Sequence, residues 1–510
     1  MKLFSFLNFG NIKQKNHNHF NSNIISFVKQ NENNFCNGKF KESFKTLEKY
    51  RQDNSSDKKN NYLMSINEAK YYFDLYNYDE TKKILDYIEK EYENFTDNSF
   101  KEIQLSLCMF EKDLHKFNDI KQYFLIGKQT NQSNEYFDFM YALNTGDIEQ
   151  AKELFDSLKE NEKSDYLKAN LYAQSFFKTQ DEEDGLLYVR LCKTLIKDNK
   201  LNFLQKKNIL EMLYVIEKSF TRKYSRSILE NENYIKDYQV ILENILQNDN
   251  LQYFGFDYQK YIKYNYCEIL LLFEENDKFI EFYINNEDEL FNYFYFSYID
   301  IAKNDIDHNM IQDKILETKD FKLMYGYITY CKDKKAHSFL SSNYKLLDEH
   351  NLIFCFVKIC LDKKFEVTQE IKHFIANKSE SNIVYYFLNL KLKKIASSDE
   401  LEKLYSKLDT TLSCEFIKDI ILFFQEQNFN PWEDIILKFK DKYNELVELG
   451  LSCFYNNINI NQFENFIKNI DQTLYQKEIS SIYLNCGEYK KSLKITQNLW
   501  YDEKIDKTIL

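Results

Sequence analysis

"GKFKESFKTL" (residues 38–47) opens with one of only nine glycines in a chain of 510 residues, and the pattern that it begins decides the fold. Gly38 is followed two places later by Phe40 and three places after that by the small residue Ser43. A glycine can end a helix in a left-handed turn, because it lacks a Cβ atom. A second helix that begins at Phe40 would bury this ring, and Ser43 would let the two helices approach closely. We therefore interpret the stretch as the turn of a helical hairpin.

The same pattern returns along the chain. A turn residue, a large residue and a smaller or apolar residue recur at Tyr76, Tyr78 and Thr81, at His115, Phe117 and Ile120, at Gly146, Ile148 and Ala151, and at Gly487, Tyr489 and Ser492. The first positions of the first four blocks differ by 38, 39 and 31 residues. Apolar residues at intervals of three and four follow each block, which predicts an amphipathic second helix. The repeating unit is a helix, a tight turn and a helix.

Composition agrees with an all-α chain. Glycine (9) and proline (1) are too rare for the many turns of a large β protein, and 44% of the residues are hydrophobic, enough to bury a core. The net charge of −12 opposes general binding to nucleic acid. The ten cysteines are scattered singly, and no apolar run is long enough to span a membrane, so we expect a soluble cytoplasmic protein.

This pattern resembles the tetratricopeptide-repeat (TPR) family, in which a glycine commonly ends the first helix, an aromatic residue opens the second, and a small residue allows close packing. The residues that carry the resemblance, and for which it implies a role in packing the repeats, are Gly38, Phe40, Ser43, Ala69, Tyr72, Tyr78, Gly146, Ile148, Ala151, Gly487, Tyr489 and Ser492. The sequence departs from the family in lacking its proline after the second helix, and Tyr76 and His115 stand where glycine is usual.

The resemblance implies an α-solenoid, a right-handed superhelix of about 12 to 14 TPR-like hairpins. The alternative is another α-α superhelix with an irregular middle section. We divide the chain into a polar tail (1–24), TPR-like repeats (25–165), degenerate helical repeats (166–470) and a C-terminal hairpin with a capping segment (471–510).

Nothing in the sequence predicts catalysis. The glycine-rich loops that bind nucleotides and the common hydrolase motifs are missing, so we expect a non-catalytic protein with no cofactor and no metal ligands. His17 and His19 fit a solvated tail better than a metal site. In the same way Asp305, Asp307 and His308 fit helix capping better than a metal site.

Three segments are candidates for partner binding. By alignment to the family, Asn67, Lys70 and Asp74 are placed on the concave face. One subclass of the family clamps the C-terminal carboxylate of chaperones with lysine and asparagine side chains. This chain has Val28 and Glu32 at those two positions, which disfavours such a clamp. Arginine occurs only four times, and Arg190, Arg222 and Arg226 lie within 37 residues. Arg222 and Arg226, with Tyr224 between them, would share a helix face that can grip a phosphate or carboxylate, or simply face solvent.

The third segment, residues 253–266, holds seven aromatic residues in fourteen. Tyr258, Tyr261 and Tyr264, interleaved with Lys260 and Lys263, could stack on single-stranded nucleic acid. Aromatic residues at helical spacing more often fill the seam between packed hairpins, and we favour that interpretation.

We therefore expect a scaffold or adaptor that binds a protein or peptide on the concave face of its superhelix. The alternatives are a sensor that responds to a peptide or small ligand and controls a separate effector, and a nucleic-acid-associated repeat protein; an unrecognised enzyme is the last. The partner, the pathway and the oligomeric state do not follow from the sequence.

Overall fold

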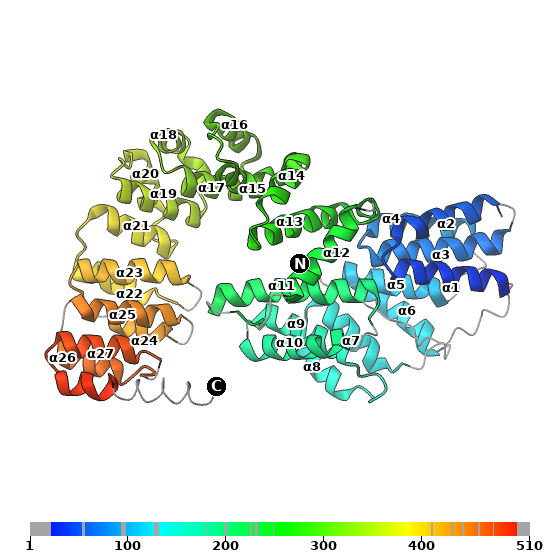
Figure 1. Cartoon of the computed structure of the whole chain (residues 1–510), viewed down its shortest axis with the longest axis horizontal. Helices are drawn as coiled ribbons and strands as arrows, with labels where there is room; N and C mark the ends of the chain where they lie inside the picture. Colours follow the sequence, from blue (N-terminus) through cyan, green and yellow to red (C-terminus); the bar gives the residue numbers. More distant parts are fainter. Residues whose placement is uncertain are drawn as a thin grey trace. The chain divides into compact units, whose positions relative to one another are not determined.

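The computed structural model is all-α in every part of the chain that it describes (Figure 1). The described residues are 22–53, 57–92, 98–126, 132–179, 181–197, 201–224, 227–229, 233–247, 249–409, 412–429, 432–440, 443–456, 459–472 and 474–496. Over these ranges the regular elements are helices and there is no strand. The predicted all-α helical-repeat solenoid is confirmed. The chain divides into two compact units, Met1–Leu290 and Phe291–Leu510, called unit 1 and unit 2 below.

Unit 1 is built of successive helix pairs. They are α1 (Ser22–Cys36) with α2 (Phe40–Asp53), α3 (Lys58–Asp74) with α4 (Tyr78–Glu91), α5 (Asn98–Glu111) with α6 (Leu114–Ile126), α7 (Asn134–Thr145) with α8 (Ile148–Ser157), α9 (Asp165–Thr179) with α10 (Glu182–Lys197), α11 (Phe203–Tyr224) with α12 (Asn233–Gln247), and α13 (Phe256–Leu272) with α14 (Asn276–Asn285). A short 3₁₀ helix, η2 (Leu251–Tyr253), precedes α13.

Unit 2 continues the same plan. Its pairs are α15 (Glu287–Ala302), which begins at the end of unit 1, with α16 (His308–Thr318), α17 (Phe321–Cys331) with α18 (Lys334–Ser342), α19 (His350–Lys363) with α20 (Gln369–Lys378), α21 (Ile383–Lys393) with α22 (Ser398–Ser406), α23 (Cys414–Glu426) with α24 (Trp432–Phe439), α25 (Asn444–Asn456) with α26 (Ile460–Ile467), and α27 (Gln476–Asn485) with a helix over 489–496. The 3₁₀ helix η3 (Tyr344–Leu347) lies between α18 and α19.

The described residues thus form fourteen hairpins, within the expected 12 to 14. Hairpins continue through the described parts of 166–470, the range in which the sequence pattern fades, and the division between the two units falls inside that range. α1 begins at Ser22, just inside the expected tail, whose first 21 residues lie outside the described ranges.

The turn at Gly38 has the expected geometry. Gly38 has a φ of +81°, and its amide donates to the Phe35 carbonyl at 2.9 Å. Phe40 and Ser43 are completely buried. The Asn31 amide donates to the Ser43 carbonyl at 3.2 Å, so a small residue here brings α1 and α2 within hydrogen-bonding distance.

The same close approach recurs in other hairpins. The Thr81 hydroxyl donates to the Ala69 carbonyl at 3.5 Å, and the Ser480 hydroxyl donates to the Ser492 carbonyl at 3.2 Å. Each pair is twelve positions apart, as are Asn31 and Ser43. A small residue twelve places along therefore marks where the second helix crosses the first.

Most of the other predicted packing residues form a turn or are at least half-buried, and one is exposed. Gly146 and Gly487 have positive φ angles of 83° and 78°, and the buried residues that go with them are Ile148, Ala151 and Ser492. Tyr72 is half-buried, with its ring 4.6 Å from that of Phe44. Tyr489 is different. It opens a helix as expected, but its side chain is 68% exposed, because no described element packs over that face.

The third hairpin corrects the register read from the sequence. Its left-handed residue is Lys112 (φ 63°), and α6 begins two places later at Leu114, so His115 lies inside the helix and does not form the turn. The left-handed residues of the first four hairpins are then 38, 76, 112 and 146, which are 38, 36 and 34 apart. The repeat is more regular than the sequence pattern indicated.

Unit 1 also closes on itself through contacts between residues far apart in sequence. The segment 249–258, here called the closing segment, lies against the turns of the first two hairpins (Figure 1). The buried side chain of Asn250 accepts from the Lys41 amide at 3.1 Å and donates to the Gly38 carbonyl at 3.2 Å. The Gly255 amide donates to the Leu75 carbonyl at 3.3 Å. These bonds join the seventh hairpin to the first and second.

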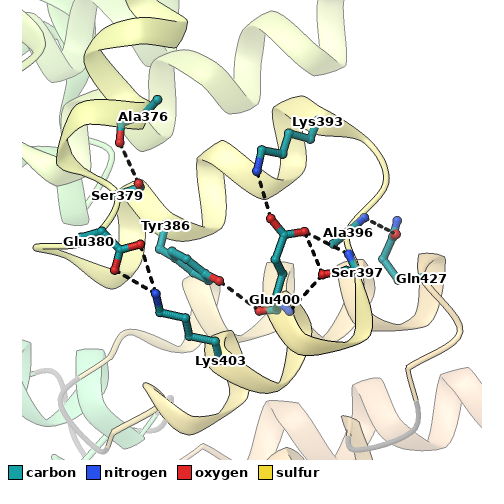
Figure 2. A network of polar contacts seen from close by, with 10 residues as sticks. All are labelled: Ala376, Ser379, Glu380, Tyr386, Lys393, Ala396, Ser397, Glu400, Lys403 and Gln427. Carbon is teal, nitrogen blue, oxygen red and sulfur yellow. Dashed lines mark hydrogen bonds and ion pairs between the residues drawn. The ribbon is translucent and has the colours of Figure 1, made fainter.

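Unit 2 is held together by contacts between neighbouring hairpins (Figure 2). Ser397 and Glu400 form a capping box at the start of α22, in which the Ser397 amide donates to the Glu400 carboxylate at 3.0 Å. The Tyr386 hydroxyl donates to the Glu400 carbonyl at 3.3 Å, and the Gln427 side chain accepts from the Ala396 amide at 3.2 Å. The Tyr386 bond lies within the α21–α22 hairpin, and the Gln427 bond joins this hairpin to the next one, α23–α24.

Candidate functional site

A cavity of about 610 Å³ lies inside unit 1, next to the closing segment. Its volume is typical of pockets that hold a small ligand or a few residues of a peptide. Five helical regions contribute to its wall: the α3–α4 turn and α4 (Tyr76, Asn77, Tyr78, Asp79, Lys82), α5 (Phe110), α9 and α10 (Tyr166, Asn170, Tyr188), α11 (Asn208, Ile209, Glu211, Met212) and the start of α13 (Gly255, Phe256, Asp257, Tyr258, Tyr261). We call it the unit 1 cavity.

Gly255 allows the closing segment to reach the cavity. A Cβ atom at this position would lie 2.3 Å from the carbonyl oxygen of Tyr76 and 3.1 Å from its carbonyl carbon. Any other residue would therefore collide with the backbone of the α3–α4 turn. This is the close backbone approach that glycine alone permits.

A buried ion pair lies at the wall, where Glu211 is one of the lining residues. Lys207 and Glu211, one turn apart on α11, are 0% and 5% exposed, and Nζ of Lys207 is 2.6 Å from Oε2 of Glu211. The Lys207 ammonium also donates to the Asn208 side chain at 2.9 Å and to the Tyr258 hydroxyl. The Tyr258 hydroxyl in turn donates to Glu211. Burial lowers the pKa of Lys207, while Glu211 opposes that shift.

Two tyrosine rings complete the surroundings of this ammonium group. Nζ of Lys207 lies 4.9 Å from the ring centroid of Tyr76 and 4.4 Å from that of Tyr258. The two rings stack on each other at 4.2 Å. The Tyr76 hydroxyl donates to Asn208 at 3.1 Å. Lys207 thus joins α11 to the α3–α4 turn and to α13, three segments that meet only because unit 1 closes.

One polar group of the wall has unused hydrogen-bonding capacity. Within the described ranges, the Asn208 amide nitrogen is buried without a hydrogen-bond partner. A buried donor that lacks a partner costs free energy, commonly about 1–3 kcal/mol. A ligand that brings an acceptor to this wall would remove that cost.

The charges at the edge of the cavity are unevenly paired. Lys82 forms an ion pair with Glu111. Asp79 and Asp257 are exposed, and neither lies within ion-pair distance of a basic group among the residues that the structure describes. Two carboxylates of the described lining, Asp79 and Asp257, are therefore not used in an ion pair, although the Asp79 charge helps to raise the pKa of Lys82 and Lys83.

The residues predicted on the concave face lie beside the cavity and not in it. Asn67 is buried and donates to the Leu63 carbonyl at 2.7 Å, and Lys70 pairs with Glu32 of α1 at 2.6 Å. Burial raises the pKa of Asp74 to about 7, with Lys70 opposing the shift. Burial raises the pKa of Tyr78, a cavity residue, above its usual value, and the Asp74 charge adds to this shift. Asp74 is therefore close enough to the wall for its charge to act on a lining residue.

Tyr78 packs within its repeat, as expected, with its ring centroid 5.3 Å from that of Phe73 on α3. Its ring also stacks on Phe110 at 3.8 Å, and both Tyr78 and Phe110 line the cavity. The residue that opens α4 is thus part of the cavity wall as well as of the repeat.

Arg190, the arginine candidate whose side chain the structure describes, does not line the cavity. Arg190 lies exposed on α10. α11 extends to Tyr224, but the side chains of Arg222 and Tyr224 lie outside what the structure describes, as does the whole of Arg226. The proposed anion-binding face stays a prediction.

The tyrosine-rich segment packs within unit 1. The ring of Tyr253 stacks on Phe44 at 4.4 Å, and that of Tyr258 stacks on Tyr76. Lys263 pairs with Glu289 at 2.5 Å. The aromatic residues therefore fill a seam, as we favoured, but the seam joins hairpins that are distant in sequence.

The Asp305–His308 stretch caps a helix. The Asp307 carboxylate accepts from the Asn309 and Met310 amides at 3.1 Å, at the start of α16. His308 lies 3.0 Å from the Tyr327 hydroxyl and 3.3 Å from Asp333. His17 and His19 lie outside the described residues.

Sequence reasoning missed Lys207, Glu211, Asn208 and Gly255. One signal was present: Gly255 interrupts an aromatic run, "YFGFDY", away from any hairpin turn, and such a glycine indicates close backbone approach. Burial of Lys207 carried no sequence signal, since lysine is rarely buried.

Comparison with known proteins assigns no family. No family model matches the chain. A leucine-rich repeat and coiled-coil domain-containing protein of Plasmodium falciparum is 28% identical over 141 residues, which cover 26% of this chain and 12% of that protein. The chain thus matches about an eighth of that relative. A leucine-rich repeat has a strand in each unit, whereas the described residues form none. In this part of the chain, moreover, no helix is both long and apolar enough to cross a bilayer.

Proposed function

We propose that this chain is a non-catalytic interaction protein of the TPR-like class, which works in the cytoplasm and binds a protein or peptide partner in the unit 1 cavity. The observation that carries the proposal is the cavity itself, with its tyrosine and asparagine wall. Tyrosine offers a large, rigid contact surface with a polar end, and asparagine can pair with peptide groups.

The chemistry of the wall supports binding more than catalysis. Burial raises the pKa of Tyr188 and Tyr258 well above the ordinary value, which makes these phenols poor proton donors and acceptors near neutral pH. The Lys207 ammonium is engaged by Glu211, Asn208 and Tyr258. Such fixed groups suit recognition of a ligand of defined shape.

A second candidate, the ligand-responsive sensor, is favoured by one observation. Tyr76, Asn208 and Tyr258 line the cavity and also take part in the contacts that close unit 1. A ligand that moves these side chains would bias the closure, and so could transmit binding to an effector. The nucleic-acid alternative is weaker, because Tyr253 and Tyr258 already stack on rings of the protein.

Selection from a random displayed dodecapeptide library on the full chain tests the proposal. Asn170 is a half-buried cavity residue, so the substitution Asn170→Trp fills the cavity; Asn285→Trp makes the same change at an exposed position outside it. We expect peptides that bind the wild-type chain and Asn285→Trp but not Asn170→Trp. Failure to select any such peptide would refute cavity binding.

A further inference from the structure

The unit 1 cavity combines three features that together select a positively charged ligand group. The first is its aromatic wall. Eight rings contribute to the lining: Tyr76, Tyr78, Phe110, Tyr166, Tyr188, Phe256, Tyr258 and Tyr261. The faces of such rings are negative, and a cation within about 6 Å of a ring centroid gains roughly 0.5–2 kcal/mol, more as water is excluded.

The second feature is the charge balance of the lining. Lys82 and Lys207 already have carboxylate partners in Glu111 and Glu211, while Lys260 lies 4.2 Å from the ring centroid of Phe256. Asp79 and Asp257 form no ion pair among the described residues, and they come from two different segments, the first turns of α4 and α13. An anionic ligand would meet these two carboxylates, whereas a cationic one would pair with them.

The third feature is a cation that this wall already holds. The Lys207 ammonium lies over the Tyr76 and Tyr258 rings with a carboxylate, an amide oxygen and a hydroxyl around it. The chain's own lysine thus demonstrates the chemistry that a second, external cation would meet.

We propose that the unit 1 cavity receives the side chain of a lysine or arginine from a partner peptide, so that the ligand is a basic segment; this rests on the proposed function. The charged end pairs with Asp79 and Asp257, and the aliphatic stem packs on Ile209 and Met212. A carbonyl of the peptide accepts from the Asn208 amide, whose nitrogen has no protein partner in the described ranges.

The peptides selected above provide the first test. We expect lysine or arginine at one fixed position of every cavity-dependent peptide. A pool with acidic or apolar residues at that position would overturn the cation inference and leave peptide binding intact. An empty pool would refute both, unless free spermidine, titrated by calorimetry, binds the wild-type chain and not Asn170→Trp. In that case the cationic chemistry holds and the ligand is a free amine.

Changes in the peptide and in the chain then test which groups bind the positive charge of the ligand. Calorimetry with one selected peptide and its lysine-to-norleucine analogue should show about a tenfold weaker Kd for the analogue. Asp79→Asn and Asp257→Asn should each weaken binding of the lysine peptide about threefold and reduce its salt dependence.

Asp277→Asn is the matched control, because Asp277 is an exposed acid in the first turn of α14 and does not line the cavity. We expect it to leave the Kd unchanged. Equal effects of all three substitutions, or equal binding of the norleucine peptide, would overturn the assignment of the two aspartates.

Discussion

Units 1 and 2 are made of the same helical hairpin, yet only unit 1 closes around a cavity with residues from distant repeats. In unit 1 hydrogen bonds join positions up to 212 apart, as between Asn250 and Gly38. In unit 2 they span shorter separations, such as the 61 positions between Lys358 of α19 and Asp419 of α23, whose side chains are 2.8 Å apart. The described pocket of unit 2, beside His308 and Phe339, lies between helices of adjacent hairpins. The repeat alone therefore does not create the site.

What differs is a small set of residues outside the repeat pattern. Asn250 satisfies the backbone at the first turn, Gly255 permits contact with the second, and Lys207 links three segments. A solenoid in which each repeat touches only its neighbours needs none of these. Substituting these residues one at a time tests whether they cause the difference between the two units.

The largest effect is expected from Lys207→Met. It leaves Glu211 buried without its cation and should destabilise unit 1 by about 3–5 kcal/mol. Lys218→Met on the same helix is the control, since Lys218 and Glu268 are partly exposed and should contribute about 1 kcal/mol or less. Hydrogen exchange followed by mass spectrometry should show faster exchange in α11 and α13, with unit 2 unchanged.

Removing both charges sharpens this result. Lys207→Met with Glu211→Leu should recover much of the lost protection, because the unpaired carboxylate is then gone. If the single variant behaves like Lys218→Met, the buried pair does not hold unit 1 closed.

The next effect is expected from Gly255→Ala. The added Cβ atom would overlap the Tyr76 carbonyl, and we expect a loss of about 2–3 kcal/mol in the free energy of unfolding of unit 1. Gly146→Ala adds a methyl group to open space at a φ of +83°, so it should cost only the backbone strain, about 1–2 kcal/mol. Urea titration by circular dichroism measures both. A smaller loss for Gly255→Ala than for Gly146→Ala would contradict the close-approach argument.

A pH-dependent effect, smaller because water reaches part of the side chain, is expected at Asp74. Its folded pKa, about 7, lies above the ordinary value of 3.8, so between these pH values the folded state holds a proton that the unfolded state has lost. Stability from this group is therefore greatest below about pH 4, falls as the pH rises to 7, and is constant above.

Asp74→Asn should remove this slope, and the variant should be the more stable at pH 8. The urea midpoint of unit 1, measured from pH 4 to 8, tests this. Asp277→Asn serves as the control because Asp277 is exposed. An unchanged slope in Asp74→Asn would refute the raised pKa.

The sequence predicted the local part of this molecule well and the long-range part poorly. Hairpins follow from apolar spacing and from markers such as Gly38 and Ser43, which act within one repeat. The cavity depends on Asn250, Gly255 and Lys207, whose partners lie elsewhere in the chain. The sequence around these three residues does not indicate their partners. Because lysine is rarely buried, sequence reasoning places Lys207 on the surface.

The fading of the repeat signal in the middle of the chain also has a physical cause. The hairpins there continue, but their turns use non-glycine residues with positive φ angles: Glu274, Lys303, Lys364, Lys394 and Asn428. A left-handed residue with a Cβ atom is strained by about 1–2 kcal/mol. These turns form despite that strain, and they lack glycine, the residue by which the sequence pattern is detected. Tyr76 in unit 1 is such a case, and there the strained residue also stacks on Tyr258.

The smallest predicted effect concerns one of these non-glycine turn residues, in unit 2. Lys364 caps α19 with φ 56° and ψ 35° and is exposed, so Lys364→Gly relieves the strain without losing a buried contact. Greater freedom of the unfolded chain offsets part of the gain, which leaves about 0.5–1 kcal/mol of added stability. Lys363→Gly, one residue earlier and still helical, should instead destabilise unit 2 by up to about 1 kcal/mol. Urea midpoints of unit 2 that move in opposite directions for these neighbours would show that the turn conformation, and not loss of a lysine, sets the sign. Movement in the same direction would mean that the left-handed turn carries no measurable strain.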